Sequence, residues 1–217
     1  MGALARAAPW LASAAVLAAG GAATWRLTDG LQAFTSDGAR RLAVERHPRA
    51  LPTLVLQGHD GRIFDTAELR GHVTLVDFIY TGCATVCSAL GGVYGAMQRA
   101  LASEIRRGSL GLLSISLDPV HDTPAALAAW RERQRARPGW VVARARSAAD
   151  TRALLATFGV VVVPDGQGGF VHNATIGLVD ADGRLRAIYG PDEWEQAMQA
   201  ARRLTAGDAR SVALAAR

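Results

Sequence analysis

The sequence predicts an α/β domain with a central mixed sheet flanked by helices, preceded by an N-terminal membrane-anchoring helix. Two nearly continuous apolar runs, at 72–80 and 110–117, have the length and composition of strands buried on both faces. Segments of helical character alternate with them, which is typical of a parallel sheet covered by helices. Two later strand segments, at 174–179 and 185–189, are joined at Asp182-Gly183, a hairpin signal that makes the sheet mixed.

Each further element is predicted from a local signal. Asp60-Gly61 separates two short apolar segments and predicts a strand, a turn and a strand. Thr123 as N-cap and Pro124 at the first helical position begin one helix, and Ser147 caps another. The order is that of a thioredoxin-like fold. It comprises strands at 53–57 and 62–64, a helical turn at 65–70, a strand at 72–80, a helix at 88–107, a strand at 110–117, a helix at 124–136, a strand at 140–143, a helix at 148–158, a loop at 163–169, strands at 174–179 and 185–189, and a helix at 191–204.

The chain divides into an anchor or signal segment (1–28), a linker (29–50), the thioredoxin-like domain (51–206) and a C-terminal tail (207–217). No charged residue occurs between Ala7 and Trp25. A membrane-spanning helix needs roughly 17–25 apolar residues, which this run only just supplies. Its alanines also offer small-x-small cleavage sites, so a cleaved signal peptide is the alternative. Both interpretations place the domain in the periplasm or an equivalent extracytoplasmic space.

The basic composition does not predict a nucleic-acid partner. The formal net charge is +5, and all 24 basic residues are arginine. These arginines are spread along the chain among acidic residues, as in Arg131-Glu132-Arg133, which is typical of solvated helix faces. We therefore expect no nucleic acid to bind.

The only two cysteines, Cys83 and Cys87, directly follow the buried run at 72–80, where open sheets place their sites. They share one face if the segment is helical, and a helix N-terminus there lowers the pKa of a thiol. Such thiols cycle with a disulfide or hold a soft metal ion such as Cu(I). Two inert thiols or one structural disulfide stay open as alternatives, although so short a loop gains little from a bridge.

A third ligand would distinguish metal binding from redox work alone, and His172 is the candidate among five histidines. It precedes the strand at 174–179, and in thioredoxin-like folds the segment entering this strand packs against the cysteine turn. Oxidoreductases of that fold carry a cis-proline there, whereas the stretch 165–190 contains no proline. The remaining histidines occupy a linker, a turn, a strand start and a loop; they are His47, His59, His72 and His121.

Three motifs stand in a fixed order along the domain. They are Asp77-Phe-Ile-Tyr-Thr-Gly-Cys83-Ala-Thr-Val-Cys87, then Ser114-Ile-Ser-Leu-Asp118-Pro-Val-His-Asp122-Thr-Pro124, and finally His172 before the Asp-Gly turn. Over about 54–204 the chain resembles the Sco/SenC family of copper-binding cytochrome c oxidase assembly proteins. The resemblance implies copper, as Cu(I) or Cu(II), held by Cys83, Cys87 and His172, with Asp118 as an acidic residue near the metal.

Three positions depart from the family pattern. Ala84 and Ser88 stand where the family usually has proline, and Asn173 replaces the more usual hydroxyl residue after the histidine. Both thiol ligands are kept, so we expect copper binding to survive. The rigidity of the cysteine loop and its redox poise stay open.

The resemblance implies a copper chaperone rather than an enzyme, one that helps to mature the dinuclear copper centre of cytochrome c oxidase. Its partner would be the copper-binding subunit of that oxidase or another copper chaperone. One site and no second cluster predict a monomer. The alternative is a membrane-anchored thiol–disulfide reductase that uses Cys83 and Cys87 on a partner's cysteines. His172 and the missing cis-proline favour copper.

Overall fold

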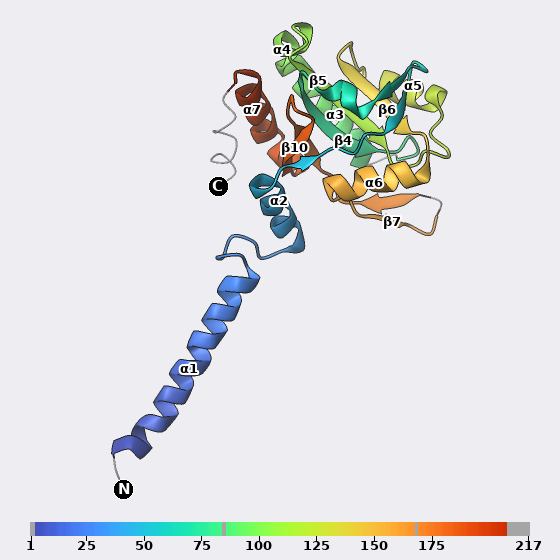
Figure 1. Cartoon of the computed structure of the whole chain (residues 1–217). Helices are drawn as coiled ribbons and strands as arrows, with labels where there is room; N and C mark the ends of the chain where they lie inside the picture. The colour runs from blue at the N-terminus through green and yellow to red at the C-terminus, as the bar shows by residue number, and fades with distance from the viewer. Residues whose placement is uncertain (1–2, 84–85, 168, 208–217) are drawn as a thin grey trace. The chain divides into compact units, whose positions relative to one another are not determined.

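The computed structural model describes residues 3–83, 86–167 and 169–207, in two compact units, 1–43 and 44–217 (Figure 1). The first unit contains α1 (Ala3–Leu27) and the start of α2 (Ser36–Arg46). Among the described residues no helix is both long and apolar enough to cross a membrane. The expectation of a spanning anchor in 1–28 is therefore not confirmed by the described part of α1.

The second unit is built on an eight-stranded mixed sheet in the order β1-β10-β9-β4-β5-β6-β2-β3. Three parallel strands form its centre, and all other pairings are antiparallel. The predicted mixed sheet is thus confirmed. The strands are β1 (Arg49–Ala50), β2 (Val55–Gly58), β3 (Ile63–Asp65), β4 (Val73–Ile79), β5 (Leu110–Ser116), β6 (Trp140–Ala145), β9 (Ile176–Val179) and β10 (Arg184–Tyr189).

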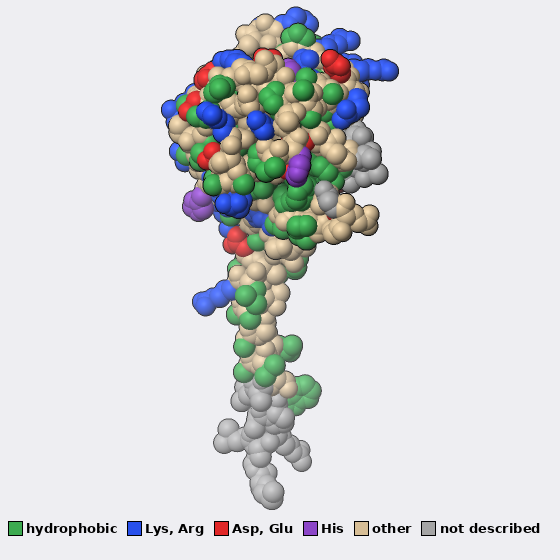
Figure 2. All heavy atoms as spheres, turned by 90° about the vertical axis from the view of Figure 1, so that its right-hand side faces the viewer, with side chains coloured by type: hydrophobic (Ala, Val, Ile, Leu, Met, Phe, Trp, Pro, Cys, Tyr) green, Lys and Arg blue, Asp and Glu red, His purple; other side chains and the backbone are tan. Residues whose placement is uncertain are grey.

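Helices cover both faces of this sheet, because β4 and β5 present apolar side chains to either side. One face packs against α3 (Val86–Ala100), α5 (Pro124–Arg133) and α7 (Trp194–Thr205). The other face packs against α6 (Ala148–Phe158) and the short helix η1 (Thr66–Leu69). A 3-10 turn, η2 (Pro191–Glu193), leads into α7. On the face that Figure 2 shows, arginine and acidic side chains are interspersed.

Three predicted segments differ from the structure. The helix expected at 88–107 is two helices, α3 and α4 (Ala102–Arg106), because Leu101 leaves the helical conformation with its side chain buried in the core. The linker contains α2 and also β1, which pairs with β10. The loop expected at 163–169 is the turn of a hairpin, β7 (Val162–Pro164) with β8 (Phe170–His172), since β-branched residues flank its glycines.

Candidate functional site

The cysteine turn follows β4 at the carboxyl ends of the three parallel strands. Cys83 is half-buried against the core, and its N–H donates to the carbonyl oxygen of Tyr80 at 3.2 Å. Cys87 lies in the first turn of α3, while its side chain, like the others of 84–89, is outside the described part of the structure. The two cysteines therefore bracket the connection from β4 to α3, where α/β sheets place their sites.

Asp122 fixes the residue two positions before Cys83. Its carboxylate is buried, and both of its oxygens lie 3.2 Å from the N–H of Thr81. The hydroxyls of Thr81 and Ser116 each donate to it at 2.5 Å. Arg133 of α5 donates to the carbonyl oxygen of Thr81 at 3.3 Å. The N–H, the carbonyl and the hydroxyl of Thr81 are thus all bonded, which holds the start of the cysteine turn in place.

Asp118, the acidic residue expected near the metal, makes its contacts within its own loop. Its carboxylate lies 2.8 Å from Nδ1 of His121, and its N–H donates to the Ser116 hydroxyl at 3.0 Å. Among the described side chains, no hydrogen bond or ion pair joins Asp118 to His172. The acid that reaches the cysteine turn is Asp122, which sequence reasoning did not single out. Both acids stand in one motif after a buried strand, and spacing alone does not tell which one points at the turn.

His172 ends β8, opposite Val162 of β7. Its Nδ1 lies 3.4 Å from the carbonyl oxygen of Asn173, and its Nε2 is buried with no hydrogen-bond partner among the described residues. Burial lowers the pKa of His172 by disfavouring the charged imidazolium, so the ring is neutral near pH 7. A buried nitrogen of this kind is unfavourable unless something binds it, and neutral imidazole is a common metal ligand.

Tyr80 joins the cysteine turn to the hairpin that carries His172. Its hydroxyl donates to the carbonyl oxygen of Phe170 at 3.3 Å and accepts from the Phe170 N–H at 3.4 Å. The two aromatic rings meet edge to face at 5.5 Å. Since the Tyr80 carbonyl also accepts the Cys83 N–H, the fold brings the histidine hairpin beside the cysteine turn.

Asp77 is fully buried in β4, on the sheet face that α3 covers. Neither carboxyl oxygen has a well-formed hydrogen bond within the described structure. Burial raises the pKa of Asp77 to about 7, and the nearby Ser114 hydroxyl opposes that shift. Burial, and then the charge of Asp77, raise the pKa of Tyr94 on α3. The signal that sequence reasoning overlooked is a single acid inside the apolar run at 72–80.

The described side chains alone do not assemble a metal site. No group of three His, Cys, Asp or Glu among them lies close enough to hold an ion, but the Cys87 side chain falls outside that set. Which metal ion would suit this turn depends on the chemistry of the donor atoms around it. Thiolates suit soft ions, and the unbonded imidazole nitrogen of His172 suits copper in either oxidation state.

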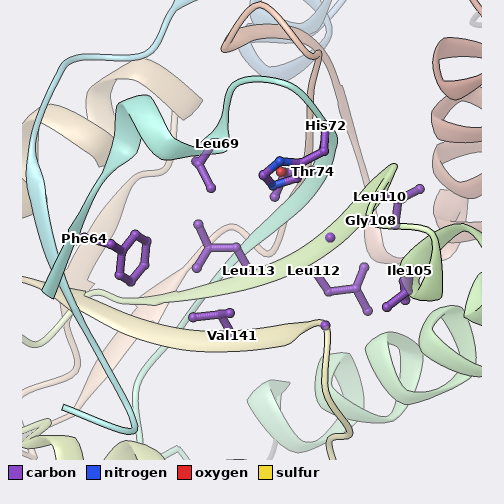
Figure 3. Close-up of a pocket in the computed structure, with 12 residues that line it drawn as sticks. Phe64, Leu69, His72, Thr74, Ile105, Gly108, Leu110, Leu112, Leu113 and Val141 are labelled. Atoms are coloured by element: carbon purple, nitrogen blue, oxygen red, sulfur yellow. The ribbon is translucent and has the colours of Figure 1, made fainter. Parts of the chain in front are cut away.

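A separate cavity of about 280 Å³ opens at the amino ends of β4, β5 and β6 (Figure 3). Leu69, Leu113 and Val141 are among its apolar lining residues, and His72 and Thr74 supply polar atoms. Burial lowers the pKa of His72, against a backbone hydrogen bond that raises it. The cysteine turn lies at the opposite ends of the same strands, so the cavity is not part of the candidate site.

A mixed sheet between helical layers, with two cysteines after its central strand, defines a thioredoxin-like protein. The SCO1/SenC family model matches residues 46–206. The chain belongs to the SCO1/SenC family, as its three motifs predict.

Known relatives agree with this assignment. The SCO1 protein homolog of Bacillus subtilis (strain 168) is 27% identical over 136 residues, which cover 61% of this chain and 69% of that protein. A SCO1/SenC family lipoprotein from Bacillus anthracis str. Ames superposes with a TM-score of 0.65 at 26% identity, covering 73% of this chain and 98% of the other. Bradyrhizobium japonicum ScoI with copper bound gives a TM-score of 0.60 at 25% identity, with 71% and 99% covered.

Proposed function

We propose that the protein binds one copper ion through the thiolates of Cys83 and Cys87 and the imidazole of His172, and that it acts as a copper chaperone. The observation that carries the proposal is the buried, unbonded Nε2 of His172 on a hairpin fastened to the cysteine turn by Tyr80. Copper in the homologous ScoI structure supports the same choice of ion.

The chemistry of the donor atoms suits an ion that changes its oxidation state or is transferred to another protein. Two thiolates favour Cu(I), and an added nitrogen makes Cu(II) acceptable as well. A helix N-terminus stabilises a thiolate near it, and Cys87 belongs to the first turn of α3. Burial lowers the pKa of His172 and so favours the neutral imidazole that binds metal. Cys83 is only half-buried, so ligands from a partner would reach the ion and take it over.

The proposed recipient is the copper-binding subunit of cytochrome c oxidase or another copper chaperone, met in the periplasm or an equivalent extracytoplasmic space. Membership of the SCO1/SenC family supports this choice. Oxidising conditions there would also permit a reversible bond between the two cysteines.

Competition titration against a chelator tests the ligand set. Cys83→Ala/Cys87→Ala should abolish stoichiometric Cu(I) and Cu(II) binding. His172→Ala should lower Cu(II) affinity by at least about 10–100-fold, the loss typical of even an outer-shell partner, and should affect Cu(I) less because both thiolates remain. His121→Ala, at an exposed histidine, is the control and should bind like wild type. Wild-type affinity for both ions in His172→Ala would remove that residue from the site.

A thiol–disulfide reductase is the second candidate, favoured by the position of Cys87 in the first turn of α3. That position lowers the pKa of a thiol and so activates it for exchange. Replacing His172 distinguishes the two functions, because reduction of a partner's disulfide needs only the cysteine pair. Full reductase activity in His172→Ala, together with unchanged copper affinity, would put the reductase first.

A further inference from the structure

We propose that Tyr80 is a positioning residue whose hydroxyl latches the His172 hairpin to the cysteine turn, so that opening the latch withdraws the histidine and leaves the two thiols in place. The inference rests on the proposed function for its copper readout only, since the latch itself is a contact within the protein.

The latch joins residues 90 positions apart in the sequence. The Tyr80 hydroxyl bonds both backbone groups of Phe170, at 3.3 and 3.4 Å, and the aromatic rings pack edge to face. These hydrogen bonds are long and therefore individually weak. They are strong enough to bias the position of the hairpin and weak enough to open.

The position of Phe170 determines the position of His172. Alternate residues of a strand point to the same face, so Phe170 and His172 share one face of β8. When Phe170 is fastened over Tyr80, the imidazole two residues further along the same face of β8 is restricted in position as well. Gly169 permits this approach, because a Cβ there would lie 3.1 Å from the Tyr80 hydroxyl and 2.5 Å from the Asp165 carboxylate.

Besides the Tyr80 contact, the hairpin is attached to the domain by the Asn173 side chain at its base and by Val162, which packs against the core. Each of its two strands has three residues, and a two-stranded ribbon is marginally stable by itself. Its outer side chains, Val163 and Val171, are 55% and 65% exposed, so that face is not packed against the domain. The Tyr80 latch therefore makes a large difference to a small element, which is the low-stability kind of segment that moves first.

The test is Tyr80→Phe, which keeps the ring and removes only the hydroxyl. In the copper-free protein we expect faster hydrogen exchange at the amides of Phe170 and His172. With copper we expect Cu(II) affinity to fall about tenfold, the lower end of the 10–100-fold typical of an outer-shell partner, and Cu(I) affinity to stay near wild type. Tyr189→Phe, which removes a phenol hydroxyl from β10, is the control and should change neither quantity.

A double-variant comparison separates positioning from general destabilisation. In a His172→Ala background Tyr80→Phe should cause no further loss of Cu(II) affinity, because the residue that it positions is absent.

Unchanged exchange in the hairpin, equal losses for Cu(I) and Cu(II), or a full further loss in the His172→Ala background would each overturn the proposal. If the wild-type protein binds no copper, the proposed function fails, and the exchange rates of the copper-free variants still decide whether Tyr80 latches the hairpin.

Discussion

The carboxyl group of Asp77 ties the stability of the protein to pH. Burial raises its pKa to about 7, whereas in the unfolded chain the value is about 3.8. Between these values the native state keeps a proton that the unfolded state has released. The contribution of Asp77 to the free energy of unfolding therefore falls as the pH rises from about 4 to about 7 and levels off above, with a drop of up to about 4 kcal/mol.

Asp77→Asn should remove that slope. The variant should be more stable than wild type at pH 8, where the carboxyl is charged, and gain little at pH 5. Urea unfolding at four pH values from 5 to 8 measures the difference, with Glu132→Gln on the surface of α5 as control. A wild-type profile parallel to that of Asp77→Asn would show that Asp77 does not carry the dependence.

Asp122 makes a second residue-scale prediction. Asp122→Asn replaces one acceptor oxygen by an NH₂ group that faces the donors of Thr81 and Ser116. We expect a loss of about 1–3 kcal/mol in the free energy of unfolding, because buried donors lose their acceptor. The matched control is Asp118→Asn. In the wild type the Asp118 carboxylate pairs with exposed His121, so its loss should lower the free energy of unfolding by under about 1 kcal/mol. Equal losses in the two variants would contradict this ranking.

At the scale of elements, the hairpin has a second attachment at its base. The side chain of Asn173 accepts the N–H of Val161 at 2.6 Å and donates to the carbonyl oxygen of Gly159 at 3.3 Å. Asn173→Ala should speed proteolysis within 160–172 while the midpoint of global thermal unfolding moves by only a few degrees. Global unfolding at a much lower temperature would show instead that the hairpin is part of the central folding unit.

The elements also show which parts of the fold can be predicted from the local sequence. β4 and β5 were predictable, because continuous apolar runs require burial on both faces. The pairing of β7 with β8 was not, because Pro164 and the following glycines favour a loop, and the hairpin depends on a contact with Tyr80 far along the chain. Cys83 and His172 stood out by residue type, whereas Tyr80 and Asp122 acquire their roles only through tertiary contacts.

At the scale of the whole molecule, the two cysteines predict that the number of free thiols depends on the redox conditions. The copper-free protein should show two reactive thiols when reduced and none after mild oxidation, by reversible formation of an intramolecular disulfide. Thiol titration of the folded protein, with mass measurement under denaturing conditions, gives the answer. Two thiols that persist, or a disulfide between chains, would contradict it.

Copper loading of the whole protein should be one ion per chain, with the protein a monomer throughout. Metal analysis combined with light scattering after gel filtration measures both quantities. A dimer that appears only with copper would indicate a site shared between two chains, and would contradict a ligand set drawn from one chain.

The two residues of β1 have a practical consequence for anyone who shortens this chain. Arg49 and Ala50 pair with Arg184 and Leu185 at the border of the sheet, and β3, the strand at the opposite border, has only three residues. A fragment begun at residue 51 would leave Arg184 and Leu185 of β10 without their strand partners on the outer side of the sheet. Such an open border invites pairing with other chains, so that fragment should aggregate, while one begun before the pairing segment should remain dispersed.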